Sequence, residues 1–170
     1  MQHSTKKLGM MFTASGWILG FLLLALIFSK VVDHQSNPNQ SVATSQSSQF
    51  KEIVLERNRY GHYVLDGEIN GKSVTFLVDT GATEISIPAN LQTYLQLKAG
   101  RSFSVSTANG VASVYSTRLG ELKLGEILLT DIKAHLNPGL PDDQILLGMN
   151  VLKNLELVQR GDSLLIRQYR

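Results

Sequence analysis

The fold is decided by one seven-residue stretch, Phe76-Leu77-Val78-Asp79-Thr80-Gly81-Ala82. Three apolar residues of a strand-forming pattern lead a carboxylate directly into a turn of small residues. A carboxylate in this position lies close to backbone and is poorly solvated, which is how proteins prepare an acid for chemistry. The chain contains such a segment once, so Asp79 is the candidate catalytic group.

Chance and local structure offer a simpler explanation of the same residues. A tetrapeptide of this kind is expected by accident in about one chain of this length per hundred. Asp and Gly are also common wherever a strand ends in a turn. One alternative is therefore a β-rich envelope domain that contains the tripeptide by chance, and the rest of the chain weakens it.

The N-terminal part of the 170-residue chain does not have a globular pattern. No charged residue occurs from Leu8 to Ser29, and this length of apolar sequence matches the hydrocarbon thickness of a bilayer. Because Lys6 and Lys7 precede it, residues 1–30 are predicted to form a cytoplasmic N-terminus and a transmembrane anchor (about 8–29). The alternative is a cleaved signal peptide, but no Ala-x-Ala-like cleavage site follows the apolar run.

Two further segments complete the predicted organisation. Residues 31–50 are predicted to be a flexible linker, because Ser, Gln and Asn dominate them and cannot bury enough apolar surface to offset the entropy of ordering. Residues 51–170 are predicted to be one globular domain. The charged residues before position 51 account for the whole net charge of +2, so this domain is neutral overall.

The composition excludes several classes of function. No basic stripe or cluster of stacking aromatic residues indicates a nucleic-acid partner. The absence of cysteine excludes disulfides, thiolate catalysis and Cys-ligated zinc. The four histidines are scattered without the spacing of metal ligands, so we expect neither a metal nor another cofactor.

After residue 50, alternation of apolar and polar residues predicts a mostly β domain with one or two short helices. Asn70-Gly71 is a strong hairpin signal, because both central positions of a type I′ turn need positive φ. Short helices are predicted at 88–95 and 149–155. The predicted strands are 53–56, 63–69, 73–78, 102–107, 111–118, 119–124, 127–129, 132–136, 145–148, 155–159 and 164–168.

This arrangement resembles the retropepsin-like (clan AA) aspartic proteases, and more closely their bacterial membrane-anchored family. Some sixty residues after the Asp79 loop comes a second signature, an apolar strand with Leu146-Leu147-Gly148 that enters a short helix. The 102–118 hairpin lies between the two signatures, where this family has its flap. The resemblance covers about residues 53–157 and implies a single-lobe, closed-barrel-like β fold that functions as a C2 homodimer.

The resemblance also implies roles for particular residues. Asp79 would be the catalytic carboxylate, supported in its loop by Thr80, Gly81 and Ala82, with Thr80 hydrogen-bonded across to the partner's loop. Two such carboxylates share one proton and activate a water between them. The flap would bring four residues to a polypeptide substrate: Thr107, Ala108, Asn109 and Gly110.

One motif per chain predicts the oligomeric state. A domain of this length has room for one lobe, and Asp142-Asp143 lacks the Thr-Gly turn and is interpreted as part of a loop. The second carboxylate is therefore expected from a symmetry mate. We expect an aspartic endopeptidase at the bacterial inner membrane, single-pass, with its catalytic domain in the periplasm.

Two other functions are compatible with parts of the sequence. A non-catalytic dimeric binding or scaffold module of the cell envelope could keep the same fold. Gly161-Asp162-Ser163-Leu164 spells a lipase and esterase signature, but no histidine follows it in the chain. A hairpin turn accounts for these residues better.

Overall fold

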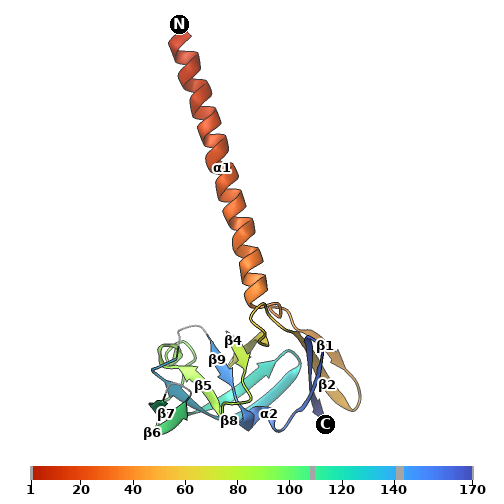
Figure 1. Cartoon of the computed structure of the whole chain (residues 1–170). Helices are drawn as coiled ribbons and strands as arrows, with labels where there is room; N and C mark the ends of the chain where they lie inside the picture. The colour runs from red at the N-terminus through yellow and green to blue at the C-terminus, as the bar shows by residue number, and fades with distance from the viewer. Residues whose placement is uncertain (1, 108–109, 141–143, 170) are drawn as a thin grey trace. The chain divides into compact units, whose positions relative to one another are not determined.

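Two units make up the chain in a computed structural model that describes residues 2–107, 110–140 and 144–169. The described residues of the first unit, Met1–Gln35, all lie in helix α1 (Gln2–Ser36), shown in red and orange in Figure 1. Among the described residues, one helical stretch, Phe12–Ser36, is long and apolar enough to cross a membrane. A signal sequence near the N-terminus has the same length and composition.

The second unit, Ser36–Arg170, is built from two antiparallel or mixed β-sheets. The smaller sheet has the strand order β1-β2-β11-β10. Its strands are β1 (Ala43–Gln46), β2 (Phe50–Glu56), β10 (Glu156–Arg160) and β11 (Ser163–Tyr169).

The larger sheet has seven strands in the order β3-β4-β9-β5-β8-β7-β6. Its strands are β3 (Val64–Ile69), β4 (Lys72–Val78), β5 (Ile85–Pro88), β6 (Ser102–Thr107), β7 (Gly110–Leu124), β8 (Ile127–Asn137) and β9 (Ile145–Leu147). Strand β3 pairs with β7 as well as with β4, so the sheet curls back on itself. This closure confirms the predicted barrel-like, mostly β fold.

The core lies inside this curled sheet because the inward positions of its strands are apolar. Phe76 of β4, Ile85 and Ile87 of β5, and Leu147 of β9 are fully buried. Strand β9 is parallel to β4 and lies between β4 and β5, which brings the two sequence signatures into neighbouring strands (Figure 1).

The helical segments are shorter than the sequence predicts. The segment predicted as a helix at 88–95 contains only the 3₁₀ turn η1 (Ala89–Leu91), followed by separate turns. Gln96 has a φ of 55°, a conformation that cannot continue a helix. The residues on either side of it, Leu95 and Leu97, are both buried in the core. Helix α2 (Met149–Leu152) likewise stops before residue 155.

The structure differs most from expectation in residues 31–50, which the sequence predicts to be a flexible linker. Helix α1 continues to Ser36, Asn39 is buried, and β1 pairs with β2. The Asn39 amide group donates to the carbonyl oxygens of Glu56 (2.9 Å) and Val64 (2.6 Å) and accepts from the Glu56 N–H (2.7 Å). These bonds stabilise a segment whose composition alone predicts disorder.

We expect Asn39→Ala to lower the free energy of unfolding by about 2–4 kcal/mol, because it removes the partner of the buried Val64 carbonyl oxygen and of both partly buried backbone groups of Glu56. The loss is measured by urea unfolding of the full chain in detergent, monitored through the β-sheet signal in circular dichroism. Asn90→Ala is the matched control, since Asn90 is exposed. Equal unfolding midpoints for the two variants would show that Asn39 does not stabilise the domain.

Candidate active site

Asp79 lies where the two signatures meet. Strand β4 ends at Val78, which pairs with Leu147 of the parallel strand β9. The Asp79 N–H then donates to the Leu147 carbonyl oxygen at 3.1 Å, which continues the ladder by one residue. The Asp79 side chain therefore emerges from the end of a strand whose position is set by the core.

The residues after Asp79 form a turn that orients its carboxylate. The Gly81 N–H donates to Oδ1 of Asp79 at 2.8 Å, and the Ala82 N–H donates to the Asp79 carbonyl oxygen at 3.3 Å. A Cβ atom at position 81 would lie 3.2 Å from the same Oδ1, so glycine leaves space for this hydrogen bond. Asp79 is half-buried, whereas Thr80 and Gly81 are exposed.

The residues that follow Gly148 of the second signature are hydrogen-bonded to the turn after Asp79. The N–H groups of Met149 and Asn150 donate to the carbonyl oxygens of Ala82 (2.8 Å) and Thr83 (3.0 Å). A Cβ atom at Gly148 would lie 2.5 Å from the Glu84 carbonyl group and 2.9 Å from the Ala82 oxygen. The two segments can approach this closely only because residue 148 has no side chain.

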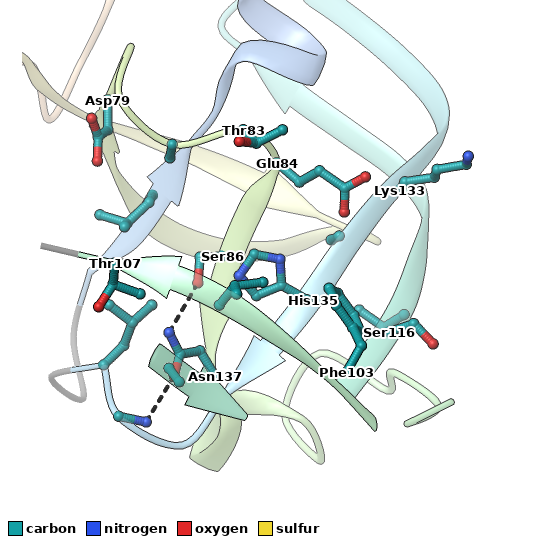
Figure 2. Close-up of a pocket in the computed structure, with 18 of the residues that line it drawn as sticks. Asp79, Thr83, Glu84, Ser86, Phe103, Thr107, Ser116, Lys133, His135 and Asn137 are labelled. Atoms are coloured by element: carbon teal, nitrogen blue, oxygen red, sulfur yellow. Dashed lines mark hydrogen bonds between the residues drawn. The ribbon is translucent and has the colours of Figure 1, made fainter. Parts of the chain in front are cut away.

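A cleft with a volume of about 1560 Å³ begins at this turn. Asp79 and Leu146 line it together with residues of β5 and β8, and the hairpin β6–β7 lines the opposite side. Figure 2 shows Asp79 and Thr107 in this cleft, with the side chains of Ser86, His135 and Asn137 farther along it.

The predicted flap corresponds to the hairpin β6–β7. Its strands pair from Ser102–Tyr115 to Thr107–Gly110, and the Thr107 hydroxyl donates to the Gly110 carbonyl oxygen at 2.8 Å. Thr107 lines the cleft. Two predicted flap residues, Ala108 and Asn109, lie outside the described residues, as do Asp142 and Asp143.

Sequence reasoning missed a group of buried polar residues in the cleft. Ser86, His135 and Asn137 are 4%, 8% and 5% exposed and all line it. Burial lowers the pKa of His135 below its ordinary value, against a smaller opposite effect of the Glu84 carboxylate. The signal was present in β8, where polar Lys133, His135 and Asn137 alternate with apolar residues, but such alternation normally indicates a face open to solvent.

The described residues, 2–107, 110–140 and 144–169, contain no group of three or more His, Cys, Asp or Glu side chains that could hold a metal ion. Asp79 supplies a carboxylate, and the exposed Thr80 and Gly81 beside it present a surface that a second protein chain could cover.

Comparisons with known proteins agree with this geometry. The model of the family described as gag-polyprotein putative aspartyl protease matches residues 65–154, slightly more than half of the chain. The crystal structure of a retropepsin-like aspartic protease from Rickettsia conorii superposes with a TM-score of 0.59 at 25% sequence identity, over 76% of this chain and 96% of that one.

Two curated relatives are themselves uncharacterized proteins. One, in the cobV 5′ region of a Sinorhizobium species, is 32% identical over 142 residues, which cover 76% of this chain and 58% of that protein. The other, from Rickettsia prowazekii, is 30% identical over 128 residues, which cover 72% of this chain and 54% of that protein. This chain thus spans somewhat more than half the length of each. On the matched family model and the shared fold, the chain belongs to the gag-polyprotein putative aspartyl protease family and is retropepsin-like.

Proposed function

We propose that this chain is a membrane-anchored aspartic endopeptidase that acts as a homodimer. The observation that carries the proposal is a half-buried carboxylate, Asp79, at a cleft, beside exposed Thr80 and Gly81. In the proposed step one carboxylate takes a proton from water while a second, protonated carboxyl donates to the carbonyl oxygen, so two carboxyl groups are needed at once. A second copy of the same loop, related by two-fold symmetry, supplies the missing group.

The proposed chemistry uses the two Asp79 carboxylates as a pair. At close distance they share one proton, because two like charges side by side are unfavourable. The ionised carboxylate takes a proton from a water held between them, and the water oxygen attacks the peptide carbonyl carbon. The protonated carboxyl donates its proton to the carbonyl oxygen, which gives the tetrahedral intermediate. The carboxyl that took the water proton then donates it to the leaving nitrogen, while the other carboxylate takes a proton back from a hydroxyl of the intermediate, and the C–N bond breaks.

The cleft supports a polypeptide substrate. Its volume of about 1560 Å³ is larger than a single side chain needs, and it runs between a sheet floor and the hairpin β6–β7. An extended peptide in such a space can pair with backbone groups of the hairpin, while alternate side chains enter pockets in the floor.

The membrane part of the proposal rests on the helix α1. Its apolar stretch Phe12–Ser36 has the length to span a bilayer, and Lys6 and Lys7 precede it. The positive-inside tendency then places the β domain on the periplasmic side of a bacterial inner membrane. Two chains anchored in one membrane also meet more often than free chains, which favours the dimer.

A subunit-mixing experiment tests the shared site. Full-length chains are co-expressed with the Asp79→Asn chain and purified in detergent, and cleavage of an unfolded protein is measured at mildly acidic pH. At equal amounts, random pairing leaves about one quarter of the dimers with two intact Asp79 residues. We therefore expect activity per total chain to fall to about one quarter of the wild-type value.

The control mixes wild-type chains with Asp162→Asn chains, because the Asp162 side chain is 86% exposed and forms a surface ion pair with Arg57. Activity should not change in that mixture. A fall to about one half with Asp79→Asn would mean that each chain acts alone, and would contradict the shared site. A wild-type chain that cleaves nothing would favour the non-catalytic scaffold.

A further inference from the structure

The three buried polar residues of the cleft lie next to one another on the neighbouring strands β5 and β8. In the parallel pairing of β5 with β8, Ser86 lies opposite His135, and Asn137 is two residues farther along the same face of β8. The Asn137 side-chain amide donates to the Ser86 hydroxyl at 3.4 Å and accepts from the Gly139 N–H at 2.9 Å (Figure 2). We call Ser86, His135 and Asn137 the polar floor.

One atom of the polar floor is unsatisfied. Nδ1 of His135 is buried and has no hydrogen-bond partner among the described residues. A buried polar atom without a partner costs free energy, and most such atoms in folded proteins are paired. The Ser86 hydroxyl accepts from Asn137 and keeps its own proton available to donate. The floor thus offers unused hydrogen-bonding capacity next to a substrate cleft.

The hairpin covers one side of the imidazole. The ring of Phe103, on β6, packs edge-on against the His135 ring with their centroids 6.0 Å apart. Phe103 is 40% exposed, so its ring can turn aside without opening the core. A ligand side chain that enters between hairpin and floor can then reach Nδ1.

Resting on the proposed protease function, we infer that the polar floor is a specificity subsite that selects an amide side chain, Asn or Gln, of the peptide substrate. An amide carries both an N–H donor and a carbonyl acceptor. It therefore matches the Ser86 hydroxyl, and it also matches Nδ1 of His135 whichever nitrogen of the neutral ring holds the proton.

Carboxylate, ammonium and apolar side chains match the polar floor less well than an amide. A carboxylate has no proton to donate when ionised, and it would be repelled by the nearby carboxylate of Glu84. An ammonium group only donates and cannot accept from Ser86. An apolar side chain would leave Nδ1 of His135 and the Ser86 hydroxyl unpaired, which penalises it strongly.

The test measures peptide retention, so that it does not depend on cleavage. Full-length Asp79→Asn chains in detergent are immobilised and exposed to a library of random octapeptides, and the retained peptides are sequenced by mass spectrometry. We expect Asn and Gln to be enriched over Leu and Met by about tenfold at one position of the retained peptides. Adding His135→Leu should abolish or reverse this enrichment, whereas adding His135→Gln should preserve it.

His62→Leu in the same background is the matched control, since His62 is exposed and does not line the cleft. Its enrichment should equal that of the parent. The inference is overturned if the parent retains no peptides, if it shows no amide preference or prefers Lys and Arg, or if His135→Leu leaves the preference unchanged. The proposed function is measured separately by Asp79-dependent cleavage in the wild-type chain, so the two can fail independently.

Discussion

Asp79→Asn is expected to lower the rate of peptide-bond cleavage by roughly 10²–10⁴-fold, the usual contribution of a positioned acid or base. Asparagine keeps the size of the side chain, and its amide oxygen can still accept the Gly81 N–H bond. It can neither take a proton from water nor donate one to a carbonyl oxygen as a carboxyl group does. The loss should therefore appear in kcat, with little change in the unfolding midpoint.

The measurement compares full-length wild-type and Asp79→Asn chains in detergent, with new peptide termini counted by mass spectrometry on an unfolded protein substrate. Asp162→Asn makes the same chemical change at an exposed ion pair with Arg57 and should retain full activity. Equal cleavage by the Asp79→Asn and wild-type chains would rule out the aspartic mechanism. Cleavage by neither, with an intact dimer, would favour the binding or scaffold function.

The succession of strands along the chain and the position of the Asp79 turn could be predicted because they depend on local signals. Asn70-Gly71 sets a hairpin wherever it lies between strands, and the structure has positive φ at both residues. Apolar runs such as 76–78 and 145–147 form buried strands for the same reason in any fold of this class. The parallel pairing of these two runs was not predicted, since no local rule joins segments so far apart.

The remaining features depend on contacts between distant residues, which local patterns do not contain. Asn39 is held in place by hydrogen bonds to backbone groups of Glu56 and Val64. The polar composition of residues 31–50 by itself predicts a flexible linker instead. His135 follows the alternation of a solvated strand, yet the hairpin with Phe103 covers that face. Whether a polar side chain is buried depends on which distant segment packs over it. For this reason neither the order of residues 31–50 nor the burial of the polar floor could be predicted from local sequence.

Gly148→Ala is expected to abolish cleavage and to lower the free energy of unfolding by roughly 2–4 kcal/mol. The φ of Gly148 is −89°, which alanine adopts without strain. The whole effect therefore comes from steric overlap of the added methyl group with its neighbours. The added methyl carbon would lie 2.5 Å from backbone atoms of Glu84, which are not the far end of a flexible side chain. The turn after Asp79 must therefore move away from α2.

This movement breaks the two hydrogen bonds that Met149 and Asn150 donate to the Asp79 turn. Amide hydrogen exchange at these two residues should speed up even in the folded variant, and urea unfolding gives the loss of stability. Gly139→Ala is the control for stability, because its added carbon would meet Asn137 Oδ1 at an ordinary 3.4 Å. If Gly148→Ala kept slow exchange and full cleavage, the close approach of the two signatures would not be what positions Asp79.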